Sequence, residues 1–249
     1  MTREELAATA RTALACLDLT SLNDNDQPAD IERLCERAVG PQGATAAVCV
    51  WPRFVALARA RLPAAVRVAA VANFPAGSTD LARALRDTQV IVDAGGDEVD
   101  VVIPYRELSC APSLLSEVRR ACEGLTLKVI LETGELQDEA LIRQACAIAL
   151  DAGADFLKTS TGKAPVSATP AAARLLLQAI AQGGHTHVGF KPAGGIRTVA
   201  DAALYIALTA EHLGSVSPQR FRIGASGLLN DIEAVLGGGA AAPASSTTY

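Results

Sequence analysis

The chain has 249 residues, of which half are hydrophobic and 4% aromatic, and its formal net charge is −5. This length suits one large domain or two small ones, and it can bury enough surface to fold without disulfides or metals. The acidic balance gives no support for nucleic-acid binding, which needs a basic face. No apolar stretch approaches the ~20 residues that span a bilayer, and the N-terminus lacks a secretory apolar core. We therefore expect a cytoplasmic protein with no membrane partner.

Neither the cysteines nor the histidines show the spacing of a metal site. The six cysteines are scattered without a CxxC pair, and we expect them to be reduced and largely buried. His185 and His187 would point to opposite faces of an extended segment, and we place them with His212 in loops or at the surface. We expect no metal and no other cofactor.

Short apolar runs alternate with longer stretches of helical periodicity along the chain. A short N-terminal helix is predicted first. Eight strands then follow, at 14–20, 46–51, 66–74, 98–104, 127–133, 155–161, 187–193 and 221–226. Each strand is followed by a helix, at 28–39, 53–61, 78–95, 112–124, 136–153, 168–184, 198–214 and 228–236 respectively. The strands are almost continuously apolar, as is typical of strands buried on both faces of a parallel sheet.

This alternation predicts an α/β protein with helical crossovers between parallel strands. Eight such units in about 250 residues is the size of a single (β/α)8 TIM barrel. The competing arrangement is an open doubly wound sheet, but no GxGxxG follows the first strand. We assign residues 1–236 to the barrel and 237–249, which are low in complexity, to a flexible C-terminal tail.

Polar residues at the carboxyl ends of the strands are the candidates for chemistry, because barrel active sites lie at that face. The main ones are Asp18, Cys49, Asp100, Lys158 and Lys191. One interpretation is an internal ion-pair network that holds the barrel mouth together. The other is a proton-transfer site, since cations and carboxylates that converge in a cleft have perturbed pKa values.

Lys158 and Lys191 end the sixth and seventh strands, which are neighbours in a barrel. If the two ammonium groups lie roughly 6 Å apart at an effective dielectric of ~20, they repel by about 2.8 kcal/mol. That repulsion lowers the pKa of one lysine by about two units, and burial acts in the same direction. A neutral lysine can attack a carbonyl and form a Schiff base.

The loops after strands 6, 7 and 8 predict a phosphate site. Barrels often bind phosphate with the loops after strands 7 and 8, where glycines let backbone N–H groups approach an anion. The candidate residues are Thr159, Gly162, Lys163, Gly194, Gly195, Arg197, Ser226 and Gly227. No GxxxxGK[ST] motif occurs, so a nucleotide P-loop is not indicated.

Over nearly its whole length the chain resembles the deoxyribose-phosphate aldolase family. The motifs that carry the resemblance are LDLTSLND (17–24), VCVWPRF (48–54), VANFPAG (71–77), GDEVDVVIPY (96–105), KVILETGEL (128–136), GADFLKTSTGK (153–163), VGFKPAGGIRT (188–198) and IGAS (223–226). The resemblance implies reversible cleavage of 2-deoxy-D-ribose 5-phosphate into D-glyceraldehyde 3-phosphate and acetaldehyde, in the breakdown of deoxynucleosides.

By motif, Lys158 matches the Schiff-base lysine of the family, Lys191 the second lysine and Asp100 the acid/base aspartate. Asp18 and Cys49 match residues near the substrate, and Cys49 has two interpretations, a packed small residue or a thiol exposed to aldehydes. Alternatives to this family are another Schiff-base sugar-phosphate aldolase, such as a transaldolase-like enzyme, and a catalytically silent sugar-phosphate-binding barrel.

Two features near the C-terminus bear on the resemblance. Gly227 stands where many relatives have a second serine after GAS, so a side-chain contact to phosphate is missing. Tyr249 ends the chain, as in relatives whose tail is thought to help protonate the enamine, and the alternative is a disordered tail. The family occurs as monomers, dimers and larger assemblies, and we include a homodimer among the partners expected.

Overall fold

A computed structural model describes residues 1–238 of the chain. The strands are β1 Leu17–Thr20, β2 Ala47–Val50, β3 Arg67–Ala72, β4 Glu98–Val102, β5 Thr126–Ile130, β6 Phe156–Lys158, β7 Gly189–Lys191 and β8 Ile223–Ala225. The helices are α1 Arg3–Ala15, α2 Pro28–Ala38, α3 Val55–Arg61, α4 Leu81–Asp93, α5 Ala111–Ala121, α6 Thr133–Leu136, α7 Glu139–Asp151, α8 Pro170–Gln182, α9 Val199–Leu213 and α10 Leu228–Leu236. Short 3-10 helices at Pro52–Phe54 and Leu108–Cys110 precede α3 and α5.

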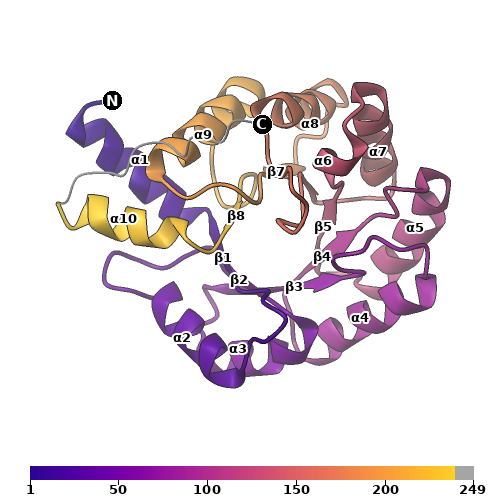
Figure 1. Ribbon diagram of the computed structural model, residues 1–249, viewed down its shortest axis with the longest axis horizontal. Helices are drawn as coiled ribbons and strands as arrows, with labels where there is room; N and C mark the ends of the chain where they lie inside the picture. The colour runs from indigo at the N-terminus through magenta and orange to yellow at the C-terminus, as the bar shows by residue number, and fades with distance from the viewer. Residues whose placement is uncertain (239–249) are drawn as a thin grey trace.

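The eight strands form one parallel sheet in the order β7-β6-β5-β4-β3-β2-β1-β8. Isolated parallel bridges from Phe190 to Phe221 and from Ala193 to Gly224 join β7 to the β8 side and close the sheet. Figure 1 shows the resulting ring of strands with the helices outside it. The predicted (β/α)8 barrel is therefore confirmed, and the open doubly wound sheet is wrong.

All eight predicted strands are present, but each is shorter than its apolar run in the sequence. The apolar residues beyond the strand ends still face the core, in the loops. The predicted helices are also present. The helix predicted at 136–153 is α7, and an additional single turn, α6, precedes it where the end of the strand at 127–133 was expected. Gln137 between them has a positive φ of 55°, which breaks the helical path.

Local sequence explains where the helices begin. Thr169 and Thr198 cap α8 and α9 with side-chain oxygens that accept from backbone N–H groups in the first turn. Asp201 completes a capping box at α9, and Gly214 ends that helix in the left-handed conformation. Each cap thus fixes the point at which a loop above the barrel turns down into its crossover helix.

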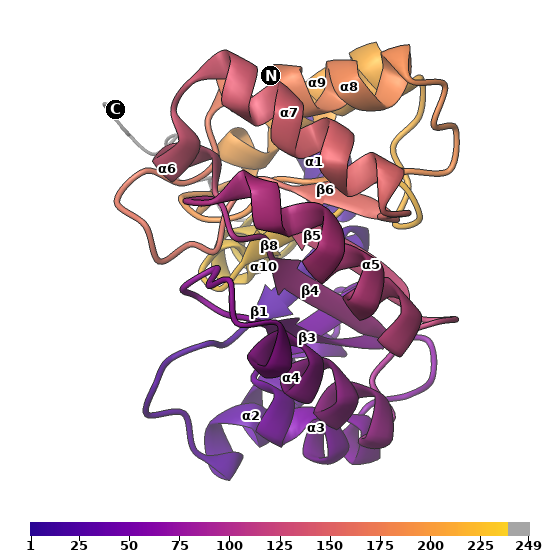
Figure 2. The same ribbon diagram turned by 90° about the vertical axis from the view of Figure 1, so that its right-hand side faces the viewer.

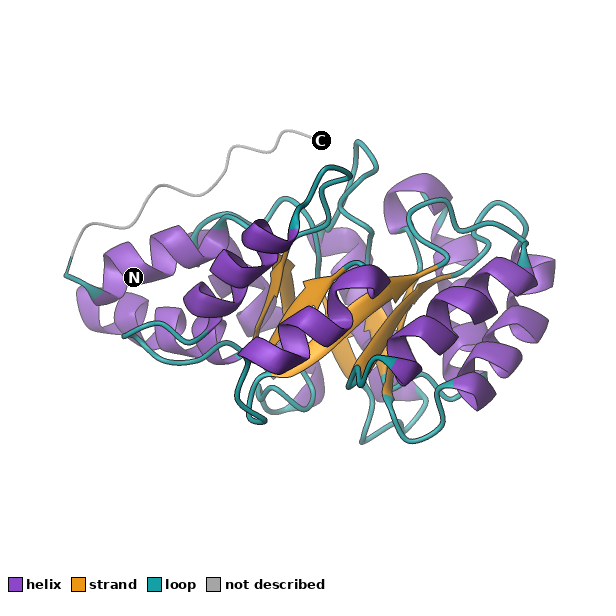
Figure 3. Ribbon diagram, turned by 90° about the horizontal axis from the view of Figure 1, so that it is seen from below, coloured by secondary structure: helices purple, strands orange, loops and turns teal. Residues whose placement is uncertain are grey.

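The helices cover the outer face of the sheet, as Figure 3 shows from below and Figure 2 shows for the flank formed by α4, α5 and α7. On the opposite flank α1 packs against α9 and α10, so the N-terminal helix joins the outer ring. Within residues 1–238 no helix is both long and apolar enough to cross a membrane. The predicted tail at 237–249 falls outside the described residues, apart from Gly237 and Gly238.

Candidate active site

Lys158 and Lys191 are register partners on β6 and β7. Registered residues of neighbouring parallel strands point to the same face, and here that face is the barrel interior. Both side chains are almost fully buried, with Lys191 completely inaccessible and Lys158 4% exposed. The structure thus brings together the two lysines that the sequence placed on neighbouring strands.

Asp100 on β4 lies between the two lysines. Its Oδ2 accepts hydrogen bonds from Lys158 Nζ and from Lys191 Nζ, both at 2.8 Å. The two nitrogens therefore cannot be more than twice 2.8 Å apart, close to the separation assumed from sequence. Lys191 also forms a short ion pair with Asp18 of β1, so both predicted aspartates contact this lysine.

Three further charged residues continue this cluster toward the amino-terminal end of the barrel, and the sequence analysis missed them. Lys128 of β5 donates to Asp100 Oδ1 at 2.7 Å and forms a short ion pair with Glu98. Arg222, just before β8, donates to Glu98 Oε1 at 2.8 Å and to Asp18 Oδ1 at 2.7 Å. Lys128 interrupts a mostly apolar strand, a signal like the one that singled out Lys158, but it lies in the middle of the strand and not at its carboxyl end.

The surroundings give the two lysines opposite pKa shifts. Burial lowers the pKa of Lys158, the single carboxylate of Asp100 opposes this, and Lys191 lowers it again, so its pKa falls below the ordinary value. Burial also acts against the charge of Lys191, but Asp100 and Asp18 outweigh it and raise its pKa. The predicted lowering of a lysine pKa falls on Lys158, but burial, and not Lys191, is its largest cause.

The aspartates are held ionised by their cations. Burial opposes the charge of Asp100, yet Lys128, Lys158 and Lys191 together keep its pKa well below the usual range. Asp18 is likewise held low against burial by Lys191, Arg222 and Lys128. Asp100 is thus a carboxylate that bridges two lysine side chains, rather than a protonated acid.

Lys158 opens into a pocket of about 540 Å³ at the carboxyl ends of the strands. Asp18, Asp100 and Lys191 do not line this pocket, and their side chains are completely buried. The predicted residues that do line it are Lys158, Gly162, Lys163, Gly194, Gly195, Arg197, Ser226 and Gly227. The pocket therefore brings the lysine together with the predicted phosphate loops.

Glycine is required where these loops meet. Gly162 and Gly194 have positive φ values of 78° and 82°, and a Cβ on Gly194 would lie 3.0 Å from the Cα of Gly162 and 2.5 Å from Ser167 Oγ. Below them, a Cβ on Gly224 would lie 3.2 Å from Lys191 Cε. The small residues thus bring the two loops together and leave room for the buried lysine.

Three predicted site residues are placed differently. Thr159 is fully buried, and its hydroxyl accepts from Ala193 N at 3.0 Å, so it joins the loops after β6 and β7 from beneath the pocket. Cys49 is also fully buried and away from the pocket lining, and burial raises the pKa of its thiol. This favours the packed interpretation of Cys49. Tyr249 lies outside the described residues.

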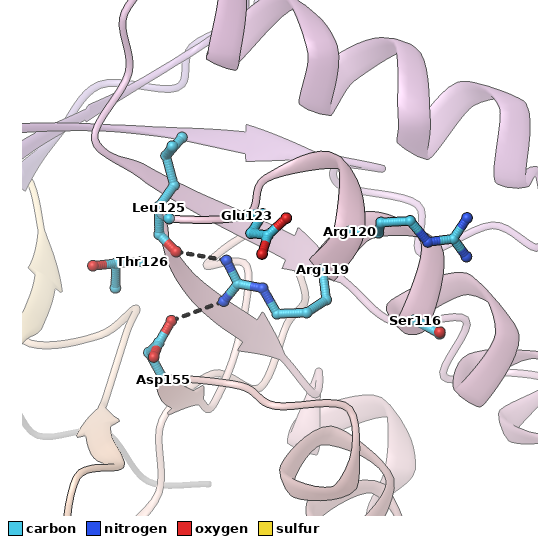
Figure 4. A pocket seen from close by; sticks show the side chains of 8 residues that line it. Ser116, Arg119, Arg120, Glu123, Leu125, Thr126 and Asp155 are labelled. Atoms are coloured by element: carbon cyan, nitrogen blue, oxygen red, sulfur yellow. Dashed lines mark hydrogen bonds and ion pairs between the residues drawn. The ribbon is translucent and has the colours of Figure 1, made fainter.

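The larger hollow on the described surface, about 640 Å³, lies near α5 and the start of β5, away from the lysines. Arg119 lies along it, donating to Asp155 Oδ2 at 3.0 Å and to the carbonyl of Leu125 at 2.7 Å, as Figure 4 shows. The partly exposed guanidinium of Arg119 is already paired within the protein, so this hollow offers no comparable constellation of reactive groups.

A family model described as DeoC/LacD family aldolase matches residues 12–233. The chain belongs to the DeoC/LacD aldolase family. It is 49% identical over 247 residues to a deoxyribose-phosphate aldolase of Agrobacterium fabrum, a match that covers 95% of each chain. The family match spans every strand and therefore includes the whole lysine cluster and the pocket.

Solved structures agree with this family assignment. A candidate deoxyribose-phosphate aldolase from Toxoplasma gondii ME49, in its apo form, superposes with a TM-score of 0.86 at 27% identity, covering 94% of this chain and 98% of that one. A deoxyribose phosphate aldolase from Aeropyrum pernix, described as a tetramer, superposes with a TM-score of 0.75 at 24% identity, covering 94% and 100%. At that lower identity the likeness concerns the fold alone.

Proposed function

We propose that this chain is a class I aldolase that reversibly cleaves 2-deoxy-D-ribose 5-phosphate into D-glyceraldehyde 3-phosphate and acetaldehyde. One observation carries the proposal: a buried lysine with a lowered pKa, Lys158, opens into a pocket that is also lined by glycine-rich loops. The substrate follows from the relative of Agrobacterium fabrum, whose name states it. Lys158 is the nucleophile because it alone among the buried cations reaches that pocket.

The first stage is formation of the Schiff base. The neutral amine of Lys158 attacks the aldehyde carbon C1 of the open-chain sugar, and the resulting carbinolamine loses water to give an iminium ion. The departing hydroxyl needs a proton. Lys191 is the nearest reservoir, and Asp100, at 2.8 Å from both amines, is the bridge that passes the proton between them.

The second stage breaks the C2–C3 bond. The iminium ion accepts the bonding electrons while the C3 hydroxyl loses its proton, so glyceraldehyde 3-phosphate leaves and an enamine remains on Lys158. Protonation of the enamine carbon regenerates an imine, and water then hydrolyses it to acetaldehyde. The iminium ion is the electron sink in the cleavage direction, and in the reverse direction the enamine carbon attacks the aldehyde carbon of glyceraldehyde 3-phosphate.

The phosphate group of the substrate is proposed to bind at the far end of the pocket. Lys163 and Arg197 line this end and supply positive charge, although Lys163 Nζ also donates to the carbonyl of Leu22 at 2.7 Å. Ser226 and Gly227 precede α10, whose N-cap carries no side-chain hydrogen bond, so backbone N–H groups there are available to an anion. The reacting aldehyde then lies toward Lys158.

Borohydride trapping tests the proposal. The protein is incubated with acetaldehyde, reduced, digested and mapped by mass spectrometry, with Lys158→Met as the control. We expect one reduced adduct on Lys158 and none in the variant, together with cleavage of deoxyribose 5-phosphate. Without any adduct in the unmodified protein, the Schiff-base assignment is lost.

A catalytically silent sugar-phosphate-binding barrel is the second candidate. The observation in its favour is that every buried lysine already has a carboxylate partner, as a purely structural network would require. Calorimetry with deoxyribose 5-phosphate separates the two: binding without turnover and without an adduct supports the silent barrel.

The assembly state belongs to the same proposal. A homodimer is our expectation from the family resemblance, and the relative from Aeropyrum pernix is described as a tetramer. Light scattering on the purified protein measures the mass directly. A mass equal to one 25.6 kDa chain across the micromolar range would contradict the homodimer.

A further inference from the structure

The buried cluster that includes Lys158 contains unequal numbers of acids and bases. Its members, joined by ion pairs, are the bases Lys128, Lys158, Lys191 and Arg222 and the acids Asp18, Glu98 and Asp100. All have side chains that are 8% exposed or less, so water screens their charges poorly. With all seven ionised the cluster carries one uncompensated positive charge, which burial makes costly.

Lys158 is the base that the cluster compensates least. Its only carboxylate contact is Asp100 Oδ2, which Lys191 shares. Each of the other three bases contacts at least two carboxylates: Lys191 contacts Asp18 and Asp100, Arg222 contacts Asp18 and Glu98, and Lys128 contacts all three acids. Loss of the Lys158 proton therefore gives three bases against three acids at the smallest electrostatic cost.

Glu98 and Arg222 take part in this balance without reaching the substrate pocket. They lie at the other end of the barrel, where both line a separate hollow of about 500 Å³, and neither lines the pocket that holds Lys158. Glu98 nevertheless affects how strongly Lys128 pairs with Asp100, because Lys128 Nζ contacts both Glu98 Oε2 and Asp100 Oδ1. Without Glu98, Lys128 would rely more on Asp100 and leave less of it for Lys158.

We propose that Glu98 and Arg222 are positioning residues that act through Lys128 and Asp18 to fix the charge of the buried cluster, so that Lys158 is the base that gives up its proton. This inference rests on the proposed function, since it explains how the nucleophile becomes available. The residues proposed to touch the substrate lie at the carboxyl-terminal face of the barrel. Glu98 and Arg222, which set the protonation of Lys158, lie at its amino-terminal side.

Other titratable groups also face Lys158 or the pocket and enter the same balance. They are the Cys49 thiol of β2, the Glu132 carboxyl after β5, and the pocket-lining Lys163 and Arg197. Burial raises the pKa of the Cys49 thiol, which keeps it neutral, and burial raises the pKa of Glu132, whose oxygens accept from Thr161. None of these four groups forms an ion pair with Lys158. All four are unchanged in the variants described below.

The test compares variants that change the charge of the cluster in opposite directions. Glu98→Gln removes a negative charge, so the ammonium form of Lys158 becomes less favourable and the acidic limb of the pH profile moves to lower pH. Lys128→Met removes a positive charge, so the limb moves to higher pH. Removing one unit charge about 10 Å from Lys158, at an effective dielectric near 20, should move the midpoint of this limb by about one pH unit.

The double variant Glu98→Gln with Lys128→Met restores the balance and leaves no unpaired charge, so its limb should return toward that of the unmodified protein. Asp97→Asn is the matched control: it makes the same kind of charge change one residue away, at a carboxylate that pairs with Arg59 and Arg67 outside the cluster. Its profile should not move.

The measurement is the rate of borohydride-trapped adduct formation on Lys158 against pH, with acetaldehyde as the probe because it has no ionisable group. Circular dichroism checks that each variant is folded. A merely structural role for Glu98 would lower the rate at every pH and leave the midpoint unchanged. Midpoints that stay in place, or that move the same way in both single variants, overturn the inference.

The two proposals fail in different ways. If the unmodified protein forms no adduct, the aldolase assignment itself is lost. If it forms the adduct normally and the variants do not shift the midpoint as expected, only the charge-balance inference is lost. Should Glu98→Gln fail to fold, the double variant compared with Lys128→Met still reports the contribution of Glu98.

Discussion

Lys158 and Lys191 donate to the same oxygen atom, Asp100 Oδ2, at 2.8 Å each, and they are register partners on adjacent strands. The shared acceptor keeps two like charges close together in a buried site. It also divides one carboxylate between them, so the lysine with a second partner, Lys191, keeps its proton. The geometry thus distinguishes two chemically identical side chains: Lys191 has a second carboxylate partner, and Lys158, the proposed nucleophile, does not.

Replacing Lys191 should disable Lys158, the proposed nucleophile. In Lys191→Leu, Asp100 is free to pair more strongly with Lys158 and the repulsion is gone, so the pKa of Lys158 should rise. We expect turnover at pH 7 to fall by roughly 10²- to 10⁴-fold, as for loss of a group that supports proton transfer. The pH dependence of kcat/KM measures both effects. The control is Arg174→Leu, which removes an exposed cation; activity retained by Lys191→Leu with an unchanged profile would contradict the paired-lysine mechanism.

A serine at position 227 should strengthen phosphate binding. Gly227 has an ordinary φ of −84°, and a Cβ built there meets nothing within 4 Å, so the side chain fits without strain. A hydroxyl that donates to a charged phosphate contributes roughly 1.5 kcal/mol or more, so KM for deoxyribose 5-phosphate should fall about tenfold. Steady-state kinetics with unphosphorylated 2-deoxyribose provides the control, because its KM should not change. Equal effects on both sugars would place the phosphate elsewhere.

Acid should weaken the fold through the buried aspartates. The folded pKa of Asp100 lies well below its ordinary value of 3.8, so the unfolded chain binds more protons than the folded one as the pH falls through this window. The stabilisation is complete above the ordinary pKa and is lost as the pH falls toward the folded value. Urea unfolding at a series of pH values between 3 and 7 should therefore show a steady loss of free energy of unfolding below about pH 4.

Asp100→Asn gives the comparison for the acid effect. It leaves three buried cations short of a partner and should cost about 3–5 kcal/mol at pH 7. It should also flatten the pH dependence, since one of the shifted carboxyls is gone. A variant with unchanged stability, or with the same slope below pH 4, would show that Asp100 is not the source of the effect.

The tyrosine at the end of the chain carries a prediction that follows from the family resemblance alone. Tyr249 lies outside the described residues. If its phenol assists protonation of the enamine, deleting Tyr249 should slow the exchange of acetaldehyde methyl protons with deuterated solvent, while adduct formation on Lys158 continues. Nuclear magnetic resonance follows that exchange directly, with Tyr249→Phe as the control for the hydroxyl. An unchanged exchange rate would make Tyr249 a bystander.

Much of the fold was predictable because local and global signals agree. The apolar runs and the helix caps, such as Thr198 with Asp201, mark the order of the elements, and that order requires a parallel sheet. The run-and-helix pattern also placed Lys158 and Lys191 on adjacent strands. The glycines of the phosphate loops were predictable for the same reason, since turns above a barrel follow strand ends.

The base of the cluster was not predictable in this way. Arg222 and Asp18 are 204 positions apart, and Arg222 and Glu98 are 124 apart, so no local pattern links them. The period of a strand indicates which side chains face inward, but the tilt and stagger of a closed barrel decide which of them share a level. That is why Asp18 and Asp100 do not line the pocket although both were expected at its mouth.

The sequence by itself thus determined the barrel, the neighbouring lysines and the three loops that line the pocket, because each depends on the order of elements along the chain. Only the tertiary structure decided which charges meet. Closure of the sheet brings Arg222 to Asp18 and Glu98 and places Lys128 between Glu98 and Asp100. The protonation of Lys158 depends on that three-dimensional count of buried charges, since electrostatic energy depends on distance in space and burial, not on separation along the chain.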